Sequence, residues 1–188
     1  DETTMVDSNL IGIENVDGIK DEIYNDASVA MCDKLMPGNE DSGASAKASM
    51  VGHSGLLFLY IEVEDADIQM PDPDIQEGEP WNVDSVEFLL WTHNKIFDDI
   101  HQFRLDVTGY PSYYSINNLK DGEITSINGD EAAKYFEAYE VVQTESGYVI
   151  EACIDVKKYG ISYSENVGIQ MQLNDVTENT ITRTATVI

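Results

Sequence analysis

The sequence predicts an all-β protein that folds as an antiparallel β-sandwich. Segments in which apolar and polar residues alternate with a period of two recur along the chain. Such alternation is typical of strands that bury one face and expose the other. Turn-forming residues separate these segments at regular intervals, and almost no stretch has the apolar spacing of a helix. About nine short strands in this arrangement indicate a sandwich.

The length of the chain fits one domain. Its 188 residues suffice for one well-buried core and are too few for two ordinary ones, so we expect residues 1–188 to form a single domain. No apolar run approaches the roughly 20 residues that a membrane span needs. Asp1 is not followed by a basic and then apolar export signal, so either such a signal was removed or there was none.

The charge of the chain is strongly negative. Ten Lys and Arg residues face 36 Asp and Glu residues, for a formal net charge of −26. A field of this sign repels phosphate groups, so we expect neither a nucleic acid nor an anionic membrane as partner. Neutral ligands and divalent cations are compatible with it. The acidity also suits the solubility of an exported protein.

The first half of the chain contains a short strand, a loop and two longer strands. We expect the short strand at residues 10–13, after which Tyr24 enters the core. Residues 33–46 are rich in Pro, Gly and Ser and predict a loop. Strands follow at residues 47–52 and 56–64, and the second is apolar enough to lie in the centre of a sheet.

The second half begins with a long acidic loop that contains three prolines and leads to Trp81. This loop spans residues 65–80, and a loop of such length in a compact domain is usually functional or mobile. Residues 119–129 are rich in turn-forming residues, and residues 131–136 predict one or two helical turns. The remaining strands are expected at residues 85–90, 101–106, 110–117, 138–144, 147–156, 166–174 and 180–188.

Two of these strands present polar side chains close to a tryptophan. Glu87 alternates with apolar residues in the first strand, and Gln102 and Arg104 do so in the second. Trp81 stands just before them. A pyranose ring has an apolar face that can stack on an indole, and a rim of hydroxyl groups that need donors and acceptors. We therefore interpret this stretch as a sugar-binding site.

Several motifs resemble those of a known family when they are taken in chain order. They are DGxxDExY from Asp17, LLFLYIEVED from Leu56, PWNVDSVEFLL from Pro80, HQFRLDV from His101, ESGYVIEACIDV from Glu145 and VGIQMQLND from Val167. Together they resemble the family 9 carbohydrate-binding modules, over residues 16–175. That family consists of jelly-roll-like β-sandwiches attached to secreted xylanases and related enzymes. It belongs to a wider DOMON-like superfamily with sugar-binding and haem-binding members.

The resemblance implies a particular set of sugar contacts. In the family, a sugar unit, typically at the reducing end of a chain, lies between two tryptophans and forms hydrogen bonds with polar side chains of nearby strands. Carried over, this implies Trp81 as one aromatic wall, with Glu87, Gln102, Arg104 and Gln172 as polar contacts. The alternation of the strands independently places these four polar residues on exposed faces.

One departure from the family concerns the second aromatic wall. The family's second tryptophan, and an asparagine near it, lie beyond the strand that corresponds here to residues 180–188. The alternatives are that this domain was excised from a larger modular secreted protein and lacks its last strand, that it binds sugar differently, or that it does not bind sugar. Tyr113 and Tyr114 are an alternative stacking surface.

The resemblance also implies structural calcium. Asp17, Asp21, Glu22 and Asp175 lie near turns that match the family and offer oxygen ligands, so we expect them to hold the ion. Solvated surface acids are the alternative for each. The three histidines lack the ligand spacing of a zinc site. Haem held by His101 and a methionine is an alternative that the wider superfamily suggests.

Some of these residues also have ordinary structural interpretations. Trp81 can be a packing anchor, and Arg104 can serve as an ion-pair partner across neighbouring strands. We interpret Trp91 as a packing residue. Cys32 and Cys153 are the only cysteines, and both a disulfide and two free thiols are compatible with the sequence.

We therefore expect a non-catalytic module rather than an enzyme. The sequence has no Gly-rich phosphate loop, GxSxG or HExxH motif. The module would be secreted and monomeric, would recognise plant cell-wall glycans of the xylan or cellulose type, including chain ends, and would target an attached glycoside hydrolase to them. The alternative is a structural or interaction domain of a secreted protein that has lost sugar binding.

Overall fold

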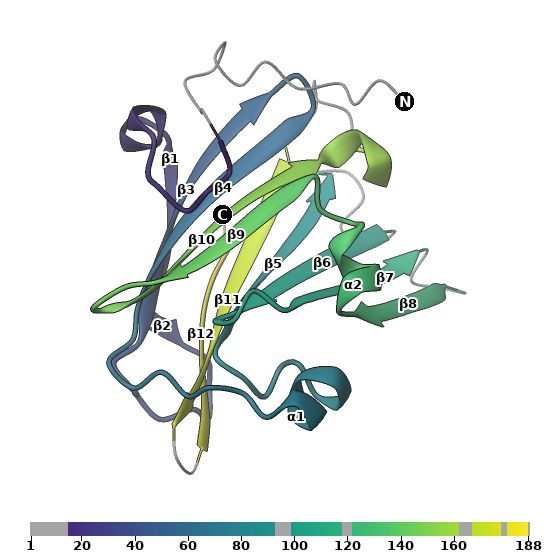
Figure 1. Cartoon of the computed structure of the whole chain (residues 1–188). Helices are drawn as coiled ribbons and strands as arrows, with labels where there is room; N and C mark the ends of the chain where they lie inside the picture. The colour runs from purple at the N-terminus through teal and green to yellow at the C-terminus, as the bar shows by residue number, and fades with distance from the viewer. Residues whose placement is uncertain (1–14, 93–98, 118–121, 162–166, 178–179, 188) are drawn as a thin grey trace.

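The computed structural model shows two antiparallel β-sheets packed face to face (Figure 1). It describes residues 15–92, 99–117, 122–161, 167–177 and 180–187. The strand expected at residues 10–13 lies outside the described residues. The predicted β-sandwich is confirmed. In the described part of the chain, no helix has the length and apolar character needed to cross a membrane.

The first sheet has five strands in the order β1-β3-β4-β10-β9. Its middle strand, β4, is buried at all but two positions, because β3 and β10 flank it and other segments cover both of its faces. The prediction of a central strand here is confirmed. The strands of this sheet are β1 (Ser28–Cys32), β3 (Ser45–His53), β4 (Leu56–Glu64), β9 (Ala138–Gln143) and β10 (Gly147–Asp155).

The second sheet has seven strands in the order β2-β12-β11-β5-β6-β7-β8. Its centre is formed by β11, β5 and β6, which carry the polar residues singled out in the sequence. The strands are β2 (Lys34–Leu35), β5 (Ser85–Thr92), β6 (Asp99–Asp106), β7 (Pro111–Asn117), β8 (Glu123–Asn128), β11 (Val167–Thr177) and β12 (Thr180–Val187).

The strand β8 forms where the sequence predicts turns. Its six residues are mostly exposed or half-buried, so they lack the alternating burial that marks a strand. The strand forms because its backbone pairs with the open edge of β7. A two-residue strand, β2, likewise forms inside the predicted loop at residues 33–46, where it pairs with β12.

A short helix, α1 (Pro73–Gly78), lies in the long loop between β4 and β5. The side chain of Asp72 caps its first turn. Gln76 in the helix donates a hydrogen bond from Nε2 to Asp106 Oδ2 at 2.6 Å. Asn128 Nδ2 donates to a carbonyl oxygen of the helix at 2.8 Å. These bonds hold the loop against one end of the seven-stranded sheet (Figure 1).

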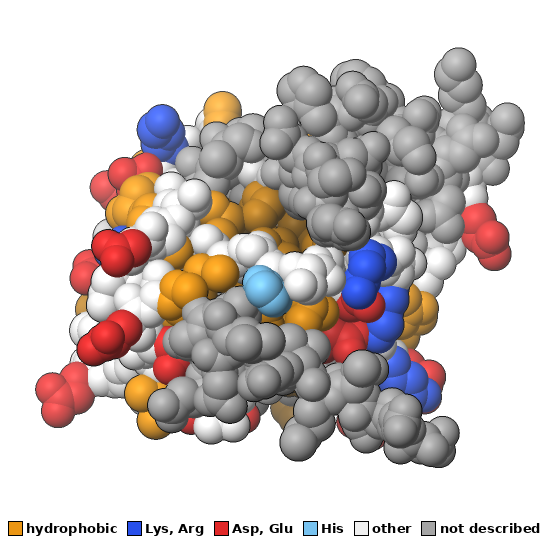
Figure 2. All heavy atoms as spheres, turned by 90° about the horizontal axis from the view of Figure 1, so that it is seen from above, with side chains coloured by type: hydrophobic (Ala, Val, Ile, Leu, Met, Phe, Trp, Pro, Cys, Tyr) orange, Lys and Arg blue, Asp and Glu red, His pale blue; other side chains and the backbone are white. Residues whose placement is uncertain are grey.

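The described part of the chain contains three further short helices. They are η2 (Glu22–Asn25), α2 (Asp130–Ala133) and η3 (Val156–Tyr159). The one or two helical turns predicted at residues 131–136 correspond to α2. Figure 2 views the molecule from above, so it shows the end of the sandwich that lies at the top of Figure 1. Acidic side chains are scattered around the rim of this end, and hydrophobic side chains lie between them.

The main core fills the space between the two sheets. Phe88 and Phe103 lie stacked at its centre, with ring centroids 5.5 Å apart. A smaller cluster lies on the outer face of the five-stranded sheet, where Tyr24 is buried under the incoming chain. Cys32 belongs to the main core and Cys153 to the smaller cluster, and the two do not form a disulfide.

Candidate functional site

The outer face of the seven-stranded sheet carries a continuous row of polar side chains. Residues that pair across antiparallel strands project from the same face. Glu87 pairs with Arg104 on one side and with Gln172 on the other. Arg104 pairs with Ser112, which in turn pairs with Asn128. The backbone register therefore brings together residues from five strands that are distant in the sequence.

Glu87 is the acceptor at the centre of this row. Its Oε1 accepts hydrogen bonds from Arg104 Nε at 3.0 Å and from Arg104 Nη2 at 2.6 Å. The same oxygen accepts from Asn174 Nδ2 at 2.8 Å, and Oε2 accepts from Gln102 Nε2 at 2.6 Å. Because both Glu87 and Arg104 are buried, their ion pair is rigid and its geometry is fixed. It presents the remaining guanidinium donors at a defined position.

A pocket of about 200 Å³ opens beside this row. Trp81, which lies in the same loop as α1, lines one part of the pocket and is 41% exposed. The side chain of Tyr114 on β7 also belongs to the outer face, because Tyr114 pairs with Gln102. The lining residues are Gly78, Pro80, Trp81, Gln102, Arg104, Ser112, Tyr113, Tyr114, Ser126 and Asn128.

The structure brings together most of the residues predicted to contact sugar. Trp81, Gln102 and Arg104 line the pocket, and Glu87 holds the last two in place. Gln172 shares the face but is not among the residues that line the pocket. Its Nε2 instead donates to the side chain of the neighbouring Asn174 at 2.8 Å.

The prediction did not include the part of the pocket formed by β7 and β8. Ser112, Ser126 and Asn128 were not recognised as candidates. Tyr114 was considered only as an alternative stacking surface. These residues could have been found from the pairing of the strand at residues 110–117 with the strand that contains Gln102. This pairing fixes which side chains share a face.

Trp91 packs against the backbone of its neighbour in the sheet. It pairs with Gly168, and a Cβ placed on that glycine would lie 2.3 Å from the indole ring. The ring therefore occupies the space that a larger residue would fill. This contact agrees with the interpretation of Trp91 as a packing residue.

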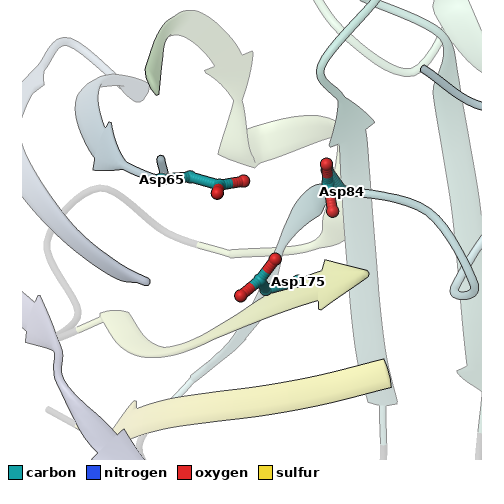
Figure 3. A group of neighbouring side chains, drawn as sticks. All are labelled: Asp65, Asp84 and Asp175. Carbon is teal, nitrogen blue, oxygen red and sulfur yellow. The ribbon is translucent and has the colours of Figure 1, made fainter. Parts of the chain in front are cut away.

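A second polar cluster lies at the base of the α1 loop. Asp65 follows β4, Asp84 precedes β5 and Asp175 lies in β11, so the cluster joins the two sheets. Their carboxylate oxygens lie within 4.8 Å of one another, and all three residues are buried. Figure 3 shows the three carboxylates turned toward a common space. Among the described residues, this is the one group of three or more such side chains that could hold a metal ion.

The electrostatics of this cluster favour a cation. Burial and, to a smaller extent, the neighbouring carboxylates of Asp65 and Asp175 together raise the pKa of Asp84 to about 7, although two backbone hydrogen bonds lower it. Burial also raises the pKa of Asp65 and of Asp175. Three carboxylates this close cannot all be charged in a buried place at low cost without a positive partner.

The available oxygen atoms suit calcium. Asp175 Oδ1 is buried and has no hydrogen-bond partner among the described residues. Calcium takes oxygen ligands and tolerates irregular geometry, so the carboxylates of the three aspartates fit it. The thiolate and imidazole ligands typical of zinc are not part of the group.

The predicted calcium ligands do not form one group with this cluster. Asp175 is part of the cluster, whereas Asp17, Asp21 and Glu22 are not. Asp17 is exposed, and its Oδ1 accepts a hydrogen bond from a backbone N–H two residues later. The motif that begins at Asp17 instead forms a cap over β10, where it is bound by Glu151. Motif matching alone does not show which loops meet in space, and calcium binding by these four residues stays a prediction.

The cap is held by the buried Glu151. Its Oε2 accepts hydrogen bonds from the backbone N–H groups of Asp17 and Gly18, both at 2.9 Å. Its Oε1 accepts from the hydroxyl of Tyr24, also at 2.9 Å. Burial raises the pKa of Glu151, against the hydrogen bonds, which lower it. Asp17, Gly18 and Tyr24 therefore have a structural role, in which they bind Glu151.

The fold and the pocket define a binding module of the β-sandwich class, with an aromatic side chain beside a rigid polar row. The chain belongs to the family described as "Carbohydrate family 9 binding domain-like", whose model matches residues 16–187. It is thus a carbohydrate-binding module and not a catalytic domain.

Two curated relatives are polysaccharide-degrading enzymes. The chain is 26% identical over 181 residues to endo-1,4-beta-xylanase A of Thermotoga maritima, covering 94% of this chain and 15% of the xylanase. It is 25% identical over 170 residues to exoglucanase XynX of Acetivibrio thermocellus, covering 90% of this chain and 14% of that protein. The chain therefore spans about 15% of the length of such relatives.

Two solved structures share the fold. Both are family 9 carbohydrate-binding modules from Caldicellulosiruptor kristjanssonii, one in complex with glucose and one with cellotriose. The first has a TM-score of 0.62 at 18% identity and covers 90% of this chain and 80% of that one. The second has a TM-score of 0.61 at 20% identity and covers 92% and 77%.

Proposed function

We propose that this module binds a neutral saccharide in the pocket beside Trp81 and directs an attached glycoside hydrolase to plant cell-wall glycan of the xylan or cellulose type. The observation that carries the proposal is the exposed indole of Trp81 next to Gln102 and Arg104, which Glu87 fixes in place. The similarity to xylanases and to structures that contain glucose and cellotriose supports the same class of ligand.

The geometry explains how a sugar would be held. The apolar face of a pyranose ring would stack on the indole, because burying that face removes apolar surface from water. Gln102 and the free donors of Arg104 would bond to hydroxyl groups at the rim. Because Glu87 already orders the guanidinium, little side-chain entropy is lost when a sugar binds.

The size of the pocket favours a single sugar ring. At about 200 Å³, the pocket is smaller than the roughly 300–1,000 Å³ typical of sites for drug-sized ligands. One terminal residue of a glycan fits this space better than several residues side by side. We therefore propose that the module recognises chain ends, and that it acts outside the cell, where such polymers occur.

Titration with sugars tests the proposed function. Glucose, xylose, cellobiose and xylo-oligosaccharides are added while heat and tryptophan fluorescence are recorded. The chain has two tryptophans, so Trp91→Phe leaves Trp81 as the only reporter and serves as the matched control. We expect Trp91→Phe to bind as the wild type does and Trp81→Ala to lose binding. Heat changes that are absent for every sugar would instead support a structural or interaction domain.

We also propose that Asp65, Asp84 and Asp175 hold a structural calcium ion. The ion would supply the positive charge that balances three buried carboxylates, and it would join the ends of strands from both sheets. Thermal unfolding with calcium and with a chelator tests this. A melting temperature that does not depend on calcium would refute the proposal.

A further inference from the structure

We infer that Tyr114 is the second aromatic contact of the saccharide pocket, an inference that rests on the proposed function. Tyr114 lies on β7, pairs with Gln102 on one side and with Ser126 on the other, and lines the same pocket as Trp81. Nothing in the family assignment gives this residue a role.

The position of the neighbouring Tyr113 determines which way the side chain of Tyr114 projects. Tyr113 points into the core, is 4% exposed and stacks on Tyr135 with ring centroids 3.8 Å apart. Its hydroxyl lies 2.8 Å from His101 Nδ1. Successive strand residues project from opposite faces, so Tyr114 must project outward. Although Tyr113 also borders the pocket, its side chain is buried in the core, whereas the side chain of Tyr114 lies on the outer face.

The surroundings of Tyr114 are polar, which distinguishes it from an ordinary packing residue. Within the lining of the pocket it adjoins Gln102, Ser112, Ser126 and Asn128. Tyrosine is common in strands, so its presence alone would not indicate a binding role. However, Tyr114 is only half-buried, and no stacking partner for its ring is found among the described residues. Its apolar face is thus available to a ligand.

The two aromatic residues reach the pocket from different elements. Trp81 comes from the loop that contains α1, and Tyr114 comes from the sheet itself. A sugar ring bound between the loop and the sheet can therefore contact an aromatic side chain on each. Ser126 and Asn128 of β8 line the same pocket and offer a hydroxyl and an amide group to the sugar's rim.

Three variants at this position and one control test the inference by calorimetric titration with cellobiose. We expect Tyr114→Ala to raise Kd by about tenfold, equivalent to about 1.4 kcal/mol. Tyr114→Phe keeps the ring and should bind within about threefold of the wild type. Tyr114→Leu keeps apolar bulk in the strand without a ring, and should bind as weakly as the alanine variant. Ile124→Ala, at a 62% exposed side chain of β8 outside the pocket, should leave Kd unchanged.

The outcomes separate this inference from the proposed function. Wild-type affinity in Tyr114→Ala or Tyr114→Leu would overturn the role of Tyr114 while leaving saccharide binding intact. Equal losses in Tyr114→Phe and Tyr114→Ala would overturn stacking, because the hydroxyl would then carry the contact. A wild-type protein that binds neither cellobiose nor the other sugars would overturn the proposed function and this inference with it.

Discussion

Glu87 is the acceptor for Arg104, Gln102 and Asn174, so its removal is expected to destabilise the fold as well as the pocket. Glu87→Ala leaves the guanidinium of Arg104 without its counter-charge at a place where the residue is only 8% exposed. Breaking a buried ion pair in this way costs roughly 3–5 kcal/mol. We take the lower figure, about 3 kcal/mol, because Arg104 borders the pocket and water can reach its free donors.

Thermal unfolding followed by circular dichroism measures this cost. For a domain of this size, 1 kcal/mol corresponds to roughly 2–4 °C in Tm, so Glu87→Ala should lower Tm by roughly 6–12 °C. Replacing both Glu87 and Arg104 by leucine removes the charge together with its partner. This double variant should recover more than half of the lost stability, since an apolar pair is often as stable as a buried ion pair. It should nevertheless bind no sugar.

Two results would contradict this account of Glu87. A Tm for Glu87→Ala within about 2 °C of the wild type would mean that the ion pair does not stabilise the fold. If the double variant were as unstable as Glu87→Ala, the loss would come from packing and not from an uncompensated charge.

Three further predictions concern other parts of the molecule. Chelation should lower Tm by roughly 5–11 °C if calcium was present at about 100 times its Kd, and Asp84→Asn should abolish that difference in a calcium titration. Gly147→Ala should lower the free energy of unfolding, measured with urea, by about 3 kcal/mol, because the new Cβ would lie 2.0 Å from the carbonyl oxygen of Val63. Gly52→Ala is the control, since it has open space around it and should be neutral. Burial raises the pKa of Glu151 in the folded state above its unfolded value, so ionising this residue at higher pH costs more in the folded protein. The wild type should therefore lose stability relative to Glu151→Gln as the pH rises from 4 to 7. Parallel profiles of unfolding free energy against pH for the two proteins would contradict this.

The strand pattern was sufficient to predict the polar row but not the complete pocket. Alternation is a local property that the sequence shows directly, so it placed Glu87, Gln102 and Arg104 on one face, although Glu87 and Arg104 are buried there and not exposed as expected. Trp81 lies in a loop, whose position depends on contacts far along the chain, so its role was predicted through the family resemblance. The choice between Tyr113 and Tyr114 required the register with β6, which alternation alone does not give.

The aspartate cluster was harder to predict, because it depends on packing between the sheets. The sequence contains 36 Asp and Glu residues, and nothing local marks the three that meet. Asp65 and Asp84 lie at the two ends of the long acidic loop, and Asp175 approaches them only when β11 takes its place beside β5. The short strand β8 escaped prediction for a similar reason, since backbone pairing with β7 and not burial makes it a strand.

The loop between Asp65 and Asp84 leaves and rejoins the sandwich at a single point, because both of its end residues belong to the same carboxylate cluster. The interior of such a loop can be exchanged without moving its two ends. Closing a loop of greater length between fixed ends costs little additional free energy, so its interior can be lengthened or rewritten while the ends remain anchored. Libraries confined to this segment would therefore be a direct way to engineer modules with altered glycan preference on an unchanged scaffold.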